Sequence, residues 1–214
     1  MKIGILWDLD GTLLDTLEDL ADGVNHVLSQ FGYPVRTLEE VRRFVGNGAR
    51  NLIRQAVPEG ADPESVFAVF QGYYAAHCQV KTRPYDGIPE VLEKLSRYPM
   101  AVVSNKPDVA VKPLCEQYFP GVYALGERPD CPRKPAPDMV HRAMADIGVE
   151  QCIYVGDSEV DVLTAKNAGV PCLSVLWGFR DREEIEKNGG RYFCPAVSEL
   201  ASTLETMIRD LTVK

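Results

Sequence analysis

Residues 3–16 read IGILWDLDGTLLDT. The apolar start of this stretch predicts a buried strand, which ends in two aspartates two residues apart and a Gly-Thr turn. Because residues i and i+2 of a strand share a face, we expect the carboxylates of Asp8 and Asp10 to project together. Two anions held so close repel each other unless a cation or a shared proton offsets their charge. The pattern therefore predicts a site for a hard metal ion such as Mg²⁺, which favours oxygen ligands.

Two other interpretations of these aspartates need to be weighed. Asp and Gly are common turn residues, so the segment alone is also compatible with an ordinary turn. An EF-hand loop beginning at Asp8 would need Gly at its sixth position and Glu at its twelfth. Those positions hold Leu13 and Asp19, which disfavours the EF-hand and leaves the turn as the open alternative.

Composition limits the class of protein. The chain has 214 residues, of which 45% are hydrophobic, which suits one large domain or a core domain with an insertion. Its net charge of −8 argues against nucleic-acid or anionic-membrane partners. No apolar run reaches the ~18–20 residues that span a bilayer. We see no signal peptide at the N-terminus, and the six cysteines form no C-x-x-C pair, so we expect reduced thiols and a cytoplasmic location.

Hydrophobic spacing divides the chain into two kinds of segment. Residues 16–84 follow helical spacing, with capping boxes expected at Asp15/Glu18 and at Thr37/Glu40. Beyond residue 85, helical stretches alternate with short apolar runs, which indicates a parallel sheet covered on both faces. We therefore predict an α/β protein with a Rossmann-like core, residues 1–15 and 85–214, and an inserted all-helical cap, residues 16–84.

Three further polar clusters lie near predicted strand ends, where open parallel sheets bind ligands. They are Ser104-Asn105-Lys106, Lys134 before a proline turn, and Gly156-Asp157-Ser158 with Asp161 beyond it. Each has an ordinary interpretation when taken alone: a helix cap, a solvated lysine and a turn. Together with Asp8 and Asp10, their order along one sheet predicts a single site.

These four clusters resemble the signature motifs of the haloacid dehalogenase superfamily, and the resemblance covers nearly the whole chain. The motifs are Asp-x-Asp-Gly-Thr, Ser-Asn, Lys-Pro-x-Pro and Gly-Asp-x-x-x-Asp, which are highly specific as a set. The helical insert looks like the cap of the phosphoglycolate-phosphatase-like subgroup. Its segment Val45-Gly46-Asn47-Gly48-Ala49 is similar to a cap loop of those enzymes, although this match is short.

The resemblance implies roles for the acidic residues. Asp8 would be the nucleophile that forms an aspartyl-phosphate, and Asp10 the general acid and base. Mg²⁺ would be held by Asp8, Asp157 and the backbone carbonyl of Asp10. Ser158 and Asp161 would support the metal shell or orient Lys134.

The resemblance also implies which residues bind the substrate. Lys134 and Ser104 would hold the oxygens of the transferring phosphate, assisted by Asn105 and by backbone N–H groups near Gly11 and Thr12. In the cap, Asn47, Gly48 and Arg50 are expected to contact the leaving group. Arg50 would meet a substrate carboxylate, and a solvated helix position is an equally open interpretation of that residue.

We therefore expect a Mg²⁺-dependent phosphomonoesterase acting on a small phosphorylated metabolite, with 2-phosphoglycolate as the first candidate. Another phosphatase, or a mutase, acting on a phosphosugar, a nucleotide or pyrophosphate is the main alternative. A 2-haloacid dehalogenase would lack Asp10, and a non-catalytic member would be expected to lack Asp8 or Asp157, so both are disfavoured. The sequence leaves the substrate and the oligomeric state, monomer or homodimer, open.

Overall fold

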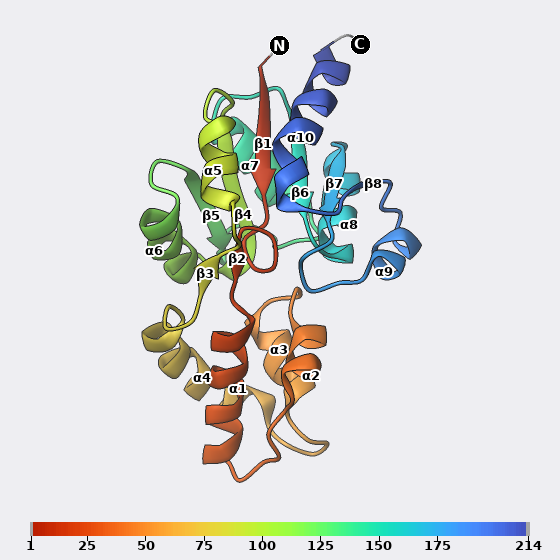
Figure 1. The fold of residues 1–214 in the computed structure, drawn as a ribbon. Coiled ribbons are helices and arrows are strands. Elements are labelled where there is room, and N and C mark those ends of the chain that lie inside the picture. The colour runs from red at the N-terminus through yellow and green to blue at the C-terminus, as the bar shows by residue number, and fades with distance from the viewer. Residues whose placement is uncertain (1, 213–214) are drawn as a thin grey trace.

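The computed structural model describes residues 2–212 and is built around one six-stranded parallel sheet (Figure 1). The strands lie in the order β5-β4-β1-β6-β7-β8. Their bounds are β1 Ile3–Trp7, β4 Met100–Pro107, β5 Tyr123–Glu127, β6 Gln151–Gly156, β7 Cys172–Val175 and β8 Tyr192–Cys194. The predicted α/β class with a parallel core sheet is confirmed.

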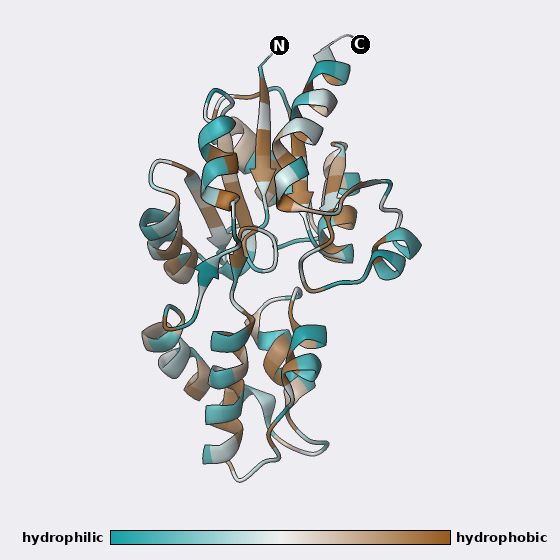
Figure 2. Cartoon of the chain, in the orientation of Figure 1, coloured by the Kyte–Doolittle hydropathy of each residue, from teal (hydrophilic) through white to brown (hydrophobic). Residues whose placement is uncertain are grey.

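Helices cover both faces of this sheet and bury its apolar residues (Figure 2). One face packs against α5 (Ile88–Lys94), α6 (Asp108–Tyr118) and α10 (Val197–Thr212). The other face packs against α7 (Asp138–Asp146) and α8 (Glu159–Ala168). Because both faces are covered, the central strand β1 is a continuous apolar run, and all five of its residues are buried. Helix α9 (Arg182–Lys187) follows the loop after β7.

A block of four helices, which we call the cap, lies below the carboxyl ends of the strands in Figure 1. It comprises α1 (Leu17–Gln30), α2 (Leu38–Phe44), α3 (Ala49–Ala56) and α4 (Pro63–His77). The two-residue strands β2 (Leu14–Asp15) and β3 (Arg83–Pro84) pair antiparallel where the chain enters and leaves the cap. The cap helices share their own apolar cluster. The domain boundaries at residues 15/16 and 84/85 stay a prediction.

The two predicted capping boxes had different outcomes. Thr37 and Glu40 form the reciprocal pair of hydrogen bonds at the start of α2. The box at Asp15 and Glu18 was wrong, because α1 begins one residue later than that box requires, with Thr16 as its N-cap. Asp15 instead accepts a hydrogen bond from the N–H of Leu17.

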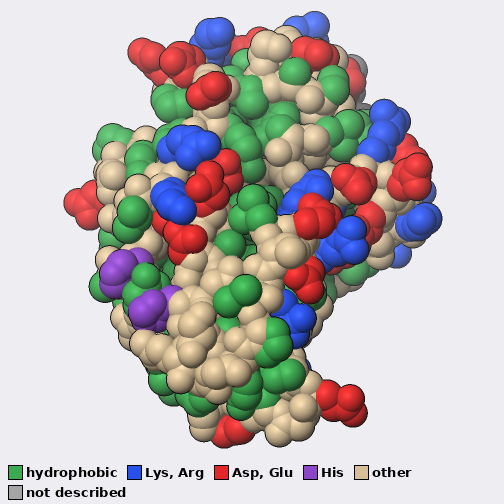
Figure 3. All heavy atoms as spheres, turned by 60° about the horizontal axis from the view of Figure 1, so that its bottom comes forward, with side chains coloured by type: hydrophobic (Ala, Val, Ile, Leu, Met, Phe, Trp, Pro, Cys, Tyr) green, Lys and Arg blue, Asp and Glu red, His purple; other side chains and the backbone are tan. Residues whose placement is uncertain are grey.

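The topology brings the polar strand ends together. Strand β1 lies between β4 and β6, with Trp7 opposite Val102 on one side and Val155 on the other. Asp8, Ser104 and Asp157 consequently lie at the carboxyl ends of three adjacent strands, facing the cap. In Figure 3, which brings the cap forward, acidic and basic side chains lie beside one another in the upper part and along the right side of the face shown. Among the described residues, no helix is both long and apolar enough to cross a bilayer.

Candidate active site

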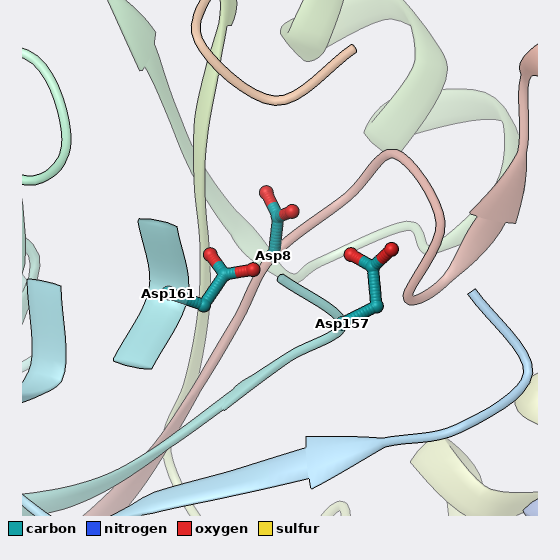
Figure 4. A group of neighbouring side chains, drawn as sticks. All are labelled: Asp8, Asp157 and Asp161. Atoms are coloured by element: carbon teal, nitrogen blue, oxygen red, sulfur yellow. The ribbon is translucent and has the colours of Figure 1, made fainter. Parts of the chain in front are cut away.

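Three buried carboxylates gather at the end of the central strands (Figure 4). Asp8 follows β1, Asp157 follows β6, and Asp161 lies in the first turn of α8. One oxygen of each lies within 4.8 Å of one oxygen of the other two. Their exposed fractions are 8%, 1% and 0%, so water screens these charges little.

One ammonium group connects two of these carboxylates. The Nζ atom of Lys134 donates to Oδ1 of Asp8 at 2.7 Å, to Oδ1 of Asp161 at 2.8 Å and to the hydroxyl of Tyr154 at 3.0 Å. All three donors of the ammonium are therefore used. The hydroxyl of Tyr154 donates a hydrogen bond to the carbonyl of Val103 at 3.0 Å, so its oxygen is left to accept the hydrogen bond from Lys134.

The charges in this cluster are not balanced, because three buried carboxylates share one buried ammonium. Burial, followed by the charge of Asp161, raises the pKa of Asp8 well above its usual range. The same two causes raise the pKa of Asp157 to about 7. Although burial opposes the charge of Lys134, the carboxylates of Asp161 and Asp8 outweigh it and raise the pKa of that ammonium. Such an excess of oxygen-bearing negative charge fits a hard divalent cation.

Asp157 and Asp161 are held in position by short contacts. Asp157 accepts hydrogen bonds from the Thr12 hydroxyl at 3.2 Å and from the Phe179 N–H at 2.6 Å. Asp161 accepts from both the N–H and the hydroxyl of Ser158, at 3.1 and 2.6 Å. Oδ2 of Asp161 accepts from Ser158, and Oδ1 accepts from Lys134. Both oxygens of this carboxylate therefore have hydrogen-bond partners without a metal.

Glycines make room for these carboxylates. A Cβ atom on Gly156 would collide with the side chain of Asp161, and one on Gly178 would collide with that of Asp157. Only glycine lets the two strand ends approach the acidic side chains so closely.

The carboxylate of Asp10 is not part of the group formed by Asp8, Asp157 and Asp161. It is half-buried, and its Oδ1 atom accepts a hydrogen bond from Nζ of Lys106 at 2.9 Å. The same ammonium donates to the hydroxyl of Tyr74 in α4 at 2.8 Å. This chain of contacts connects β1 and β4 of the core with the cap. In this arrangement the side chain of Asp10 lies outside the three-carboxylate group, so only its backbone carbonyl stays available for the predicted metal contact.

Of the residues predicted to bind phosphate, Ser104 lines the cavity, whereas Asn105, Gly11 and Thr12 make hydrogen bonds within the protein. Ser104 is buried at the end of β4 and lines the cavity beside Lys134. The amide of Asn105 instead bonds to the backbone of Lys134 at 2.9 and 3.0 Å and to the carbonyl of Gly46 at 3.2 Å. The N–H groups of Gly11 and Thr12 donate to the carbonyls of Leu14 and Leu9 within the turn, so neither is free for phosphate here.

A cavity separates the core from the cap at this point. Asp8, Asp10, Ser104, Lys134 and Asp157 line it from the core side. The cap contributes mostly apolar surface, from Leu20, Val45, Ala49 and Leu52. A ligand that enters would therefore meet charged groups on one side and an apolar wall on the other.

Of the three predicted cap contacts, Gly48 lines this cavity, whereas Asn47 and Arg50 do not. Arg50 is exposed and pairs with Glu64 of α4, and its guanidinium lies 4.5 Å from the ring centre of Phe67. As placed here, Arg50 does not reach a ligand in the cavity, which agrees with the solvated interpretation of that residue.

Sequence reasoning gave no role to several residues that the site uses. Arg180 is buried and donates to Glu159 and to the carbonyls of Arg42, Arg43 and Val45, so it joins the core to the end of α2. Lys106 differs from these residues, because it belonged to the predicted site cluster Ser104-Asn105-Lys106 and only its contacts with Asp10 and Tyr74 were not predicted. Tyr74 and Tyr154 lie in apolar runs and look like core residues in the sequence.

A parallel α/β core with an acidic cluster at its strand ends and a helical cap over them defines a capped hydrolase fold. Residues 5–175 match the family described as haloacid dehalogenase-like hydrolase. The chain therefore belongs to the haloacid dehalogenase-like hydrolase family.

Similar proteins place it near one branch of that family. Phosphoglycolate phosphatase 1 of Pseudomonas aeruginosa is 34% identical over 97% of this chain and 77% of its own length. A phosphoglycolate phosphatase of Vibrio parahaemolyticus is 32% identical over 92% of this chain and 93% of its own. The crystal structure of an inferred phosphoglycolate phosphatase from Lactobacillus delbrueckii is 35% identical, with a TM-score of 0.87, over 94% of this chain and 97% of that one. The chain is thus an enzyme of the phosphatase type, similar to phosphoglycolate phosphatases.

Proposed function

We propose that this enzyme is a Mg²⁺-dependent phosphomonoesterase that hydrolyses 2-phosphoglycolate to glycolate and inorganic phosphate through an aspartyl-phosphate on Asp8. The observation that carries this proposal is the ion pair of Asp8 with Lys134, 2.7 Å apart at the wall of a cavity that the cap covers. The names of the relatives support the choice of substrate.

In the first step, an oxygen of Asp8 would attack phosphorus, forming the acyl-phosphate bond while the ester P–O bond breaks. The departing glycolate oxygen takes a proton from the carboxyl group of Asp10. The nearby positive charge of Lys134, whose hydrogen bonds stay with the protein, and the hydroxyl of Ser104 would stabilise the charge on the non-bridging phosphate oxygens. The contact with Lys134 also holds the Asp8 carboxylate in one orientation before substrate arrives.

In the second step, the Asp10 carboxylate would accept a proton from water as that water attacks phosphorus. The acyl-phosphate bond then breaks, inorganic phosphate leaves, and Asp8 is regenerated as a carboxylate. The apolar cap residues Val45 and Leu52 would exclude further water from the site.

Asp8, Asp157 and the backbone carbonyl of Asp10 are the groups that would hold Mg²⁺. When bound, the ion would supply positive charge that offsets repulsion between the Asp8 carboxylate and the substrate phosphate. Asp161 would not bind the ion directly, because its two oxygens accept hydrogen bonds from Lys134 and Ser158.

The test is phosphate release from a panel of phosphorylated metabolites, with Mg²⁺ and with EDTA. The panel holds 2-phosphoglycolate, hexose phosphates, nucleotides and pyrophosphate. The proposal expects metal-dependent release, with 2-phosphoglycolate giving the highest kcat/KM. Release led by another compound would keep the chemistry and change the substrate. No release from any compound would contradict the phosphomonoesterase assignment and direct attention to mutase and dehalogenase reactions.

A further inference from the structure

Three cationic side chains line the cavity: Lys106, Lys134 and Arg180. Lys134 and Arg180 already donate hydrogen bonds to other groups of the protein. The three donors of Lys134 go to Asp8, Asp161 and Tyr154. Arg180 makes four hydrogen bonds, to Glu159 and to three carbonyls at the end of α2.

Lys106 differs from the other two cations. Its ammonium makes two hydrogen bonds among the described residues, to Asp10 and to Tyr74, so one of its three donors is left for another partner. It is only 6% exposed, which makes a charge-assisted hydrogen bond to a ligand stronger than the same bond in water.

The position of Lys106 indicates which part of a substrate it would bind. Its Nζ atom lies 2.9 Å from Oδ1 of Asp10, the residue that, when protonated, would give its proton to the leaving oxygen. In the proposed mechanism the Lys106 ammonium therefore lies near the leaving group, whereas the Lys134 ammonium is bonded to the nucleophile Asp8. We expect an anion on the carbon next to the ester oxygen to reach this ammonium, which lines the same cavity as Asp8 and Asp10.

We propose that Lys106 is the specificity-determining residue of this enzyme and binds the carboxylate of the leaving group. The substrate class is then the phosphate esters of small 2-hydroxy acids, with the phosphate held at Asp8 and Lys134 and the carboxylate at Lys106. This inference rests on the proposed phosphomonoesterase function and adds the residue that reads the leaving group.

The experiment compares two esters that share the same chemical step, 2-phosphoglycolate and 2-hydroxyethyl phosphate, in which a hydroxymethyl group replaces the carboxylate. The measured quantity is the ratio of their kcat/KM values, because any effect of Lys106 on Asp10 acts on both esters and cancels. The parent enzyme should prefer 2-phosphoglycolate. In Lys106→Met, the ratio should fall by about 10- to 100-fold, the usual range for a lost charge-assisted hydrogen bond.

Two further variants separate charge from packing. Lys106→Gln removes the charge and keeps a polar group beside Asp10, so it should lose the preference as Lys106→Met does. Tyr74→Phe removes the other hydrogen-bond partner of the ammonium and should keep the preference. Circular dichroism and thermal unfolding establish that each variant is folded.

The outcomes distinguish the two proposals. If the parent enzyme hydrolyses neither ester, the proposed hydrolysis of 2-phosphoglycolate fails, and the role of Lys106 fails with it. Hydrolysis of both esters with an unchanged ratio in Lys106→Met and Lys106→Gln would overturn the role of Lys106 and leave the proposed hydrolysis standing. Loss of the preference in Tyr74→Phe as well would assign selectivity to the shape of the cavity and would also overturn the role of Lys106.

Discussion

Nζ of Lys134 lies 2.7 Å from Oδ1 of Asp8, and both side chains are almost completely buried although they come from positions 126 residues apart. The same ammonium also bonds to Asp161 at 2.8 Å. Lys134 is therefore the one cation that directly contacts this cluster among the described residues, and the site depends on it both for stability and for chemistry.

Replacing Lys134 with Met should destabilise the metal-free enzyme. The substitution leaves two buried carboxylates without their cation, which typically costs about 3–5 kcal/mol in free energy of unfolding. Urea unfolding measures this change directly. Lys94→Met, at an exposed position of α5, is the matched control and should change the free energy by less than about 0.5 kcal/mol. Equal stability of the two variants would contradict the arrangement described here.

Magnesium should stabilise the enzyme more at high pH than at low pH. Burial and the neighbouring Asp161 raise the pKa of Asp157 from its ordinary value of 3.8 to about 7. Between these two values the folded state binds more protons than the unfolded state, so the metal-free enzyme loses stability as pH rises through that range. Protons and metal compete for the same oxygens, so binding strengthens as Asp157 loses its proton.

The measurement is the increase in melting temperature on adding Mg²⁺ in place of EDTA, at about pH 5.5 and about pH 8. The increase should be larger at the higher pH, and Asp157→Asn should remove most of the difference. An increase of the same size at both pH values would count against Asp157 as a ligand.

Gly156→Ala should destabilise the fold and disturb the site together. The added Cβ would overlap the Asp161 side chain, and relieving the overlap moves Asp161 and the Lys134 ammonium bound to it. Overpacking of this kind typically costs about 1–3 kcal/mol. Gly72→Ala, in α4 with no neighbouring atom within 4 Å of the new Cβ, should instead stabilise by up to about 1 kcal/mol. Chemical denaturation of both variants tests the prediction, and a neutral Gly156→Ala would refute it.

The sequence predicted the features that depend on local pattern. Asp8 and Asp157 directly follow strands, and Ser104 follows the apolar run of β4. Parallel strands bring such positions to one edge of the sheet, so their proximity was predictable from position alone. The helical spacing of residues 16–84 likewise predicted α1 to α4.

Features that depend on tertiary contacts were not predictable in this way. Helix α6 contains Pro113, which hides its helical pattern, and β8 is only three residues long. The pairing of Arg50 with Glu64 depends on how α3 packs against α4 within the cap, and the use of Asn105 by the Lys134 backbone depends on how β4 meets the loop before α7. Side-chain hydrogen bonds between distant segments leave no periodic signal in the sequence.

The central claim is that Asp8 carries the phosphoryl group during turnover. The most direct test is to quench the enzyme with acid during hydrolysis of 2-phosphoglycolate, reduce the acyl phosphate with borohydride, and map the peptides by mass spectrometry. An aspartyl-phosphate on Asp8 would be converted to homoserine at that position, and Asp8→Asn should fold, show no such product and lose turnover by on the order of 10⁴-fold or more. Phosphate release at an undiminished rate from Asp8→Asn, or a modified residue elsewhere in the chain, would contradict the account.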